Sequence, residues 1–133
     1  SRFFHIDTPR RSIRSYAYSV DCAQIDVGKE LVDTDALGFD SSPDGMCIDR
    51  QDRLWVAFCH GGCVACFDSV DGTLLSTIEL PVVETTACTF GGPQMNQLFV
   101  TTGIKKDLAE TNAGKIFVID GLNASARPPH CFK

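Results

Sequence analysis

Short apolar segments alternate with turn-forming residues along almost the whole chain. In the clearest example, an apolar segment at 54–58 is followed by a His60–Gly62 turn and a second apolar segment at 63–67. Short runs rich in β-branched and aromatic residues and bounded by glycine are typical of β-strands. The segment 74–80, which ends before Pro81, predicts a further strand. Helical periodicity is almost absent, so the sequence predicts an all-β fold.

The same order of elements recurs further along the chain. A strand predicted at 87–90 leads through a glycine pair to a second at 98–101 and a third at 115–120. Trp55 and Phe99 occupy matching places in the two copies and lie 44 residues apart. A repeat of about 40 to 50 residues that contains several short strands is the period of propeller blades. The pattern therefore favours a β-propeller.

A weaker copy of the pattern opens the chain, with strands predicted at 3–7 and 18–22. The longer segment between them, around 10–15, contains three arginines and predicts a solvated loop. A second polar insertion is predicted at 104–114.

Three repeat units follow from this pattern: an incomplete blade at 1–41, a blade at 42–85 and a blade at 86–133. Closed propellers need at least about four blades, so we expect the chain to be part of a larger ring. One blade cannot bury both its faces without neighbours. Exposed blade edges then offer a route for copies of the chain to associate.

Composition narrows the function classes. The chain has 133 residues, of which 44% are hydrophobic, which suits one domain with a real core. Its net charge of −5 makes nucleic acid and anionic membranes poor partners. No apolar run approaches the roughly 20 residues of a membrane span, and the first residues do not resemble a signal peptide. We therefore expect a cytoplasmic protein whose seven cysteines are free thiols.

Cys63 and Cys66 have a spacing found in zinc sites, with His60 just before them. On a strand, however, residues three apart point to opposite faces of the sheet. The two thiols are therefore poorly placed to bind one ion, and only His60 and Cys63 would share a face across the turn. We interpret both cysteines as small buried hydrophobic residues.

The segment 33–38 is similar to the start of a calcium loop. Leu37 stands where an oxygen ligand is needed, and Asp44 stands where the loop requires a glutamate. No flanking helices are predicted, so an EF-hand is disfavoured. The sequence also lacks the hydrolase nucleophile elbow, the phosphate loop and the dinucleotide-binding fingerprint.

The candidate site residue is Asp44, within Pro43-Asp44-Gly45. By themselves these three residues predict an ordinary turn. Their place in the repeat changes the interpretation, because the innermost strand of each propeller blade lines the central channel. A carboxylate where this strand begins faces the point at which the blades converge, and it could hold a metal ion there.

These motifs resemble the family of regucalcin (senescence marker protein), gluconolactonase and luciferin-regenerating enzyme. The segments that carry the resemblance are 42–49, 54–57, 61–62, 85–92 and 98–102, with support from 18–21 and 114–117. The resemblance runs from Phe3 to about Leu122. It implies a six-bladed propeller, of which this chain matches the C-terminal half.

The resemblance also implies an activity. Family members bind one divalent metal ion in the channel and hydrolyse small lactones. Asp44 matches one metal ligand and is a candidate general base. The other ligands, a Glu and an Asn, and the substrate-contacting Arg and Asn are expected before Ser1, so the isolated chain is expected to be inactive. The metal could be calcium, zinc, manganese or magnesium. The alternatives are a non-catalytic calcium-binding regulatory protein and a scaffold that binds no metal.

Overall fold

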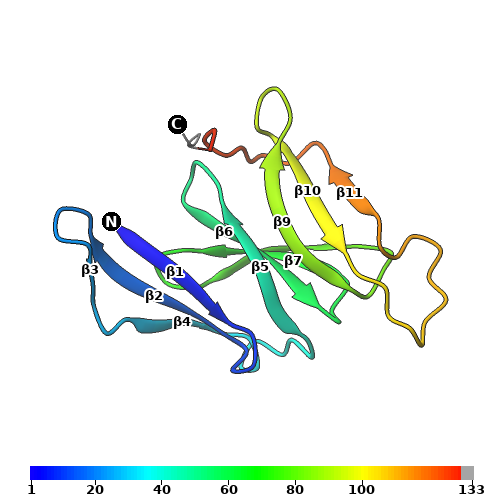
Figure 1. The fold of residues 1–133 in the computed structure, drawn as a ribbon, viewed down its shortest axis with the longest axis horizontal. Coiled ribbons are helices and arrows are strands. Elements are labelled where there is room, and N and C mark those ends of the chain that lie inside the picture. Colours follow the sequence, from blue (N-terminus) through cyan, green and yellow to red (C-terminus); the bar gives the residue numbers. More distant parts are fainter. Residues whose placement is uncertain (130–133) are drawn as a thin grey trace.

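The computed structural model describes residues 1–129, which form antiparallel β-sheets that follow one another along the chain (Figure 1). The all-β prediction is confirmed. Within this range, no helix is long and apolar enough to cross a membrane. His130, Cys131 and the end of the predicted unit 86–133 lie outside the described residues.

Three sheets account for the strands. The first contains β1 (Arg2–Asp7), β2 (Ser12–Ser19), β3 (Gln24–Ile25) and β4 (Lys29–Asp33). The second contains β5 (Ser42–Ile48), β6 (Arg53–Cys59), β7 (Cys63–Asp68) and β8 (Leu74–Glu79). The third contains β9 (Thr85–Gly91), β10 (Gln97–Thr102) and β11 (Ile116–Ile119). In the second and third sheets each strand pairs with the next in sequence, whereas β2 pairs with β1, β3 and β4.

The second sheet lies between the other two, and its central strands, β6 and β7, are buried on both faces. Leu54, Val56 and Phe58 of β6 pack with residues of the first sheet. Trp55 and Ala57, which alternate with them, pack with residues of the third sheet. Two-sided burial explains why β6 and β7 are almost continuously apolar instead of alternating with polar residues.

Aromatic side chains fill both interfaces. The ring of Phe58 stacks on that of Phe39, with 4.2 Å between centroids. On the other face, Trp55 meets Phe90 edge-on, with 5.6 Å between centroids. Trp55 is thus a packing residue.

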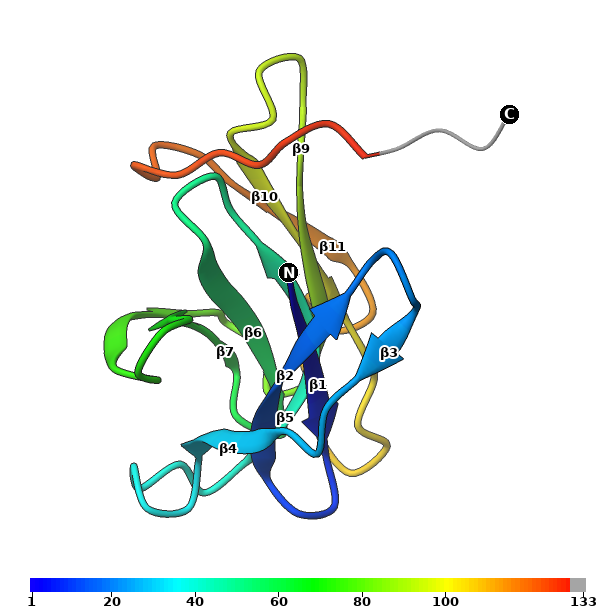
Figure 2. The same cartoon turned by 90° about the vertical axis from the view of Figure 1, so that its left-hand side faces the viewer.

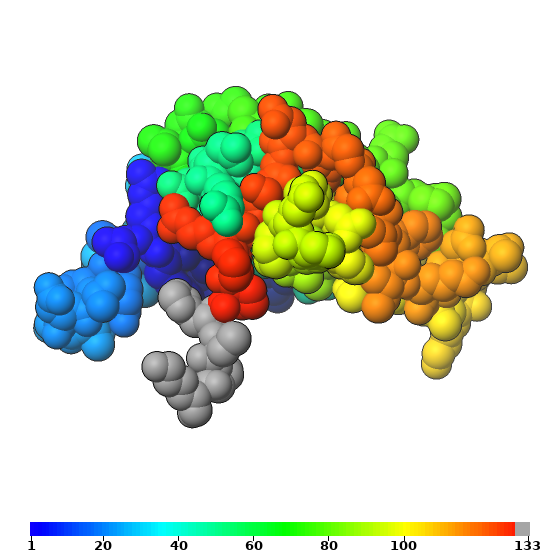
Figure 3. All heavy atoms as spheres, turned by 90° about the horizontal axis from the view of Figure 1, so that it is seen from above, coloured from blue at the N-terminus to red at the C-terminus, as the bar shows by residue number. Residues whose placement is uncertain are grey.

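The first strands of the three sheets, β1, β5 and β9, contact one another in that order. Figure 2 shows these strands running through the middle of the molecule. The segment after β11 crosses one end of the second and third sheets, between the β5–β6 and β9–β10 turns (Figure 3). It is held there by backbone hydrogen bonds from Arg50 to Ser125 and from Ala126 to Met95, both 2.8 Å long.

Asp49 organises the turn between β5 and β6. Its buried carboxylate accepts hydrogen bonds from the backbone N–H groups of Gln51 and Arg53, both at 2.9 Å. It also accepts one from Nε of Arg53 at 2.7 Å and one from the indole N–H of Trp55 at 2.9 Å. One side chain therefore satisfies the donors of the turn and orients the central tryptophan.

The prediction for the first sheet was wrong in two places. The loop expected around 10–15 is largely strand, because β2 begins at Ser12, and the strand expected at 18–22 ends at Ser19. Ser12 and Ser15 are buried beside Ile13. Small polar residues occupy positions that face the interior, and they hide the apolar pattern of this strand. Arg11 is also not free in solvent, since its Nε lies 2.8 Å from a carboxylate oxygen of Asp35.

Candidate functional site

Asp44 lies on β5, the strand of the second sheet that lies between β1 and β9. The predicted turn is instead a β-bulge, because the register of β5 against β6 shifts between Pro43 and Met46. A bulge re-aims the side chains of a strand and is common beside functional sites. The Asp44 carboxyl is half-buried, and this burial raises its pKa above the ordinary value.

Gly45 allows β5 to approach β9 closely at the bulge. A Cβ atom at Gly45 would lie 2.6 Å from Cα of Ala87 and 2.9 Å from the carbonyl oxygen of Thr86. Backbone atoms cannot move aside as a flexible side chain can. The glycine beside Asp44 is therefore required by the packing of two neighbouring strands, rather than by a turn.

Gly45→Ala is expected to lower the free energy of unfolding by about 1–3 kcal/mol, the usual cost of overpacking a tight interior. Urea unfolding followed by tryptophan fluorescence measures this loss. Adding Ala87→Gly should recover part of the stability, because it removes the side chain nearest to the new methyl group. Unchanged stability of the single variant would show that β5 and β9 can separate at this point without cost.

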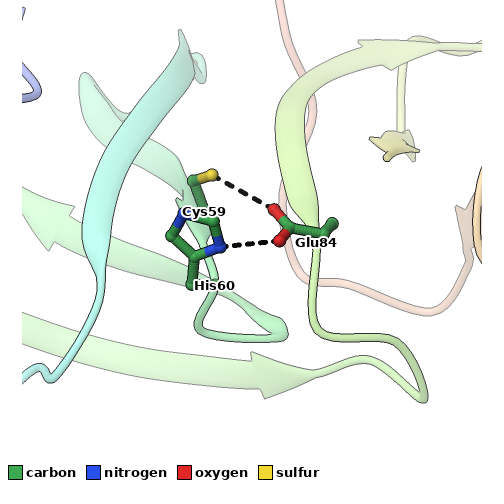
Figure 4. Close-up of side chains that lie close together, drawn as sticks. All are labelled: Cys59, His60 and Glu84. Carbon is green, nitrogen blue, oxygen red and sulfur yellow. Dashed lines mark hydrogen bonds and ion pairs between the residues drawn. The ribbon is translucent and has the colours of Figure 1, made fainter. Parts of the chain in front are cut away.

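A second group of chemical side chains gathers at the end of β6. Cys59 is the last residue of β6, His60 lies in the following turn, and Glu84 directly precedes β9. Nδ1 of His60 lies 2.6 Å from Oε1 of Glu84, and the Cys59 thiol lies 3.3 Å from Oε2 (Figure 4). The Glu84 carboxylate thus faces both partners, with one oxygen toward each.

The pKa values of Glu84 and Cys59 are shifted in opposite directions. Burial alone would raise the pKa of Glu84, but the hydrogen bonds from Cys59 and His60 and the charges of His60 and Lys105 hold it below its ordinary value. Burial, the hydrogen bond to Glu84 and the nearby carboxylates of Glu84 and Asp44 raise the pKa of Cys59 to about 11. Without a metal ion, Glu84 is therefore ionised at neutral pH and Cys59 is a protonated donor.

Backbone contacts hold the two halves of this group together. The backbone N–H of Gly62 donates to the carbonyl oxygen of Val83 at 2.9 Å. The backbone N–H of Leu80 donates to the carbonyl oxygen of Gly62 at 2.7 Å. The buried Thr85 hydroxyl lies 2.6 Å from the carbonyl oxygen of Phe58 and 3.0 Å from that of Cys63. The β6–β7 turn is thus fixed to the segment that carries Glu84.

Sequence reasoning missed this group. It paired His60 with Cys63, whereas the structure places His60 beside Cys59 and Glu84. Cys63 and Cys66 pack in the two different apolar clusters on either side of the sheet, which confirms that they point to opposite faces. Glu84 lies 24 residues from His60 in the chain, and no local spacing connects the two.

Asp44 belongs to the same end of the second sheet as this group. Ser42, two residues before it, pairs with Cys59 across β5 and β6, and the charge of Asp44 contributes to the raised pKa of the Cys59 thiol. Within residues 1–129, the Asp44 carboxylate has no hydrogen-bond or ion-pair partner of its own. A half-buried carboxylate without a partner is suited to bind a cation, although it supplies only part of the six to eight oxygens that calcium takes.

Comparison with known proteins places this arrangement in a family. A family model described as "SMP-30/Gluconolactonase/LRE-like region" matches residues 1–104. The chain belongs to this family. Regucalcin from Oryctolagus cuniculus and regucalcin from Homo sapiens are each 35% identical to it over 98% of the chain, and regucalcin from Gallus gallus is 34% identical over the same share. The chain spans 44% of the length of each of these relatives.

Solved structures of the family share the fold. A luciferin-regenerating enzyme matches 95% of the chain with a TM-score of 0.87 and 26% identity, and the chain covers 43% of that protein. A protein described as the calcium-binding protein regucalcin, from Agrobacterium tumefaciens, matches with a TM-score of 0.82 and 23% identity, over the same shares of both chains. These matches confirm the predicted partial propeller. The roles of Asp44 as metal ligand and general base stay predictions.

Proposed function

We propose that the full-length protein is a divalent-metal-dependent hydrolase of small lactones, in which Asp44 is both a metal ligand and the general base. The observation that carries this proposal is the half-buried carboxylate of Asp44, which has no partner within residues 1–129 and lies on the strand between β1 and β9. Membership of a family whose description includes gluconolactonase supports the substrate class.

A bound divalent cation would polarise the lactone carbonyl and lower the pKa of a nearby water molecule. In this chain, Asp44 is the residue that we propose contacts both the cation and the attacking water. The first oxygen of Asp44 is available to the cation, and the second is available to accept a proton from water as that water attacks the carbonyl carbon. Asp44 then returns this proton to the ring oxygen, which leaves as an alcohol group, so the product is one hydroxy acid and Asp44 is again a carboxylate.

The described part of the chain provides only one ligand of this proposed site. One carboxylate does not hold a hard cation tightly, so the isolated chain is proposed to bind such a metal weakly and to lack turnover. The remaining ligands and the substrate contacts would come from other parts of the full-length protein.

An uncovered apolar surface supports the presence of further blades. Trp55 is covered by Phe90 of the next sheet, whereas Phe99, in the matching place of the third sheet, borders an open apolar pocket with Ile116 and Ala87. Ile116 is 65% exposed. We propose that the next blade of the full-length protein covers this face, and that isolated copies of the chain associate through it.

The test is hydrolysis of an aldonolactone by the full-length protein, measured by acid release with calcium, zinc, manganese or magnesium added after chelation. Turnover that depends on one of these metals is expected. Saturable calcium binding without turnover would instead support a non-catalytic binding protein. Metal-independent turnover, or the absence of both binding and turnover, would contradict the proposal.

A further inference from the structure

We propose that Cys59, His60 and Glu84 form a binding site for a zinc-like transition-metal ion, built from other residues than the proposed oxygen-ligand site at Asp44. Each residue offers one donor atom, and the donor atoms all lie within 4.8 Å of one another. They come from two segments that are distant in the chain, the β6–β7 turn and the residue before β9 (Figure 4).

The spacing of the donor atoms suits a small tetrahedral ion. Zinc binds sulfur at about 2.3 Å and nitrogen or oxygen at about 2.0–2.2 Å, which separates its ligands by roughly 3.5 Å. The observed distance of 3.3 Å between Glu84 and Cys59 is close to this value, whereas the 2.6 Å between Glu84 and His60 is a hydrogen-bond distance that must lengthen by about 1 Å when both bind one ion. Small side-chain movements would therefore admit the ion between the three groups.

The donor types select the class of metal. Thiolate and imidazole ligands favour zinc and similar transition metals, whereas calcium and magnesium prefer oxygen ligands. Cys59 and His60 supply the first two types, and the Glu84 carboxylate neutralises part of the charge of the ion. Three protein ligands leave one tetrahedral position for water or a small ligand.

The surroundings of this group hold it in place and leave it accessible. The side chain of Glu84 is only 10% exposed, and its backbone carbonyl accepts a hydrogen bond of 2.9 Å from Gly103. The His60 side chain is 56% exposed, so an ion can approach from that side. The hydrogen bonds between the β6–β7 turn and residues 83–85 keep both segments in position.

Binding of the metal ion also requires Cys59 to lose a proton. Without metal, the Cys59 thiol donates a hydrogen bond to Glu84. A thiol must lose its proton to ligate zinc. The sulfur–metal bond therefore replaces the S–H bond, the proton passes to solvent, and the Glu84 oxygen that accepted from the thiol becomes free to bind the ion. The proton that Nδ1 of His60 directs at Glu84 moves to Nε2 by a change of tautomer, so that Nδ1 can bind the ion.

The test uses the full-length protein, freed of metal and kept reduced, and titrated with Co²⁺ as a spectroscopic substitute for zinc. Sulfur-to-cobalt charge-transfer absorption in the near ultraviolet is expected, and Zn²⁺ should remove it by competition. Cys59→Ser should abolish this absorption. In calorimetric titrations, Cys59→Ser and Glu84→Gln should each lower zinc affinity by at least about 100-fold, because loss of an outer partner alone costs roughly 10- to 100-fold.

Two control variants separate this site from other sources of metal binding. Cys22→Ser removes an exposed thiol and should leave the absorption unchanged. Asp44→Asn should keep the absorption band at saturating Co²⁺, even if the affinity changes because the charge of Asp44 acts on the Cys59 thiol, and even if lactone turnover is lost. The zinc site and the proposed function can therefore fail independently. Absence of the charge-transfer band, or its persistence in Cys59→Ser, would overturn the proposal.

Discussion

Full-length protein that carries Asp44→Asn is expected to hydrolyse lactones about 10²- to 10⁴-fold more slowly, the usual contribution of a general base. The amide has nearly the shape of the carboxylate, but it cannot accept the proton of the attacking water at neutral pH. It also lacks the charge that favours a cation. The measurement is kcat/KM for an aldonolactone at saturating metal concentration.

The matched control is Asp40→Asn, which makes the same chemical change at an exposed position four residues earlier. It should retain activity. Asp40→Asn should unfold at the same urea concentration as the original protein. Asp44→Asn should unfold at the same or a slightly higher concentration, since Asp44 makes no hydrogen bond or ion pair within the described range and the amide removes the cost of burying its charge. Normal turnover by Asp44→Asn would remove Asp44 from the proposed mechanism.

Asp49→Ala is expected to lower the free energy of unfolding by about 3 kcal/mol. Removing one partner of a buried ion pair costs roughly 3–5 kcal/mol. The lower end applies because the Arg53 side chain is 26% exposed and can be partly hydrated. The variant also leaves the indole N–H of Trp55 without its acceptor inside the core. Urea denaturation measures the loss.

Asp107→Ala, at an exposed position in the β10–β11 connection, is the control and should change stability by less than about 0.5 kcal/mol. Asp49→Asn should lie between the two, since its amide oxygen can still accept hydrogen bonds but its charge is lost. If Asp49→Ala proved as stable as the control, the buried network would not contribute to stability.

Much of the fold was predictable because strand signals are local. In the second sheet, the apolar segments at 54–58 and 63–67 became β6 and β7 with small changes at their ends. The opposite orientation of Cys63 and Cys66 was also predictable, because side chains alternate along any strand. These features depend only on neighbouring residues and on the pleat of the backbone.

The sequence predictions were wrong where contacts with strands from other parts of the chain override the local preference for a turn or loop. Pro43-Asp44-Gly45 has the composition of a turn, yet it forms a bulged part of β5 because β6 and β9 lie against it. Ser12 and Ser15 look like loop residues, yet they are buried in β2. Local propensity is too weak to resist pairing with adjacent strands.

The sequence by itself determined the all-β class and the partial propeller, since both follow from residue order and spacing, whereas the role that it assigns to Asp44 stays a prediction. Only the tertiary structure decided that Glu84 meets Cys59 and His60. That meeting depends on the way the β6–β7 turn is hydrogen-bonded to the segment before β9. These contacts join residues that are far apart in the chain, and nothing in the intervening sequence specifies them.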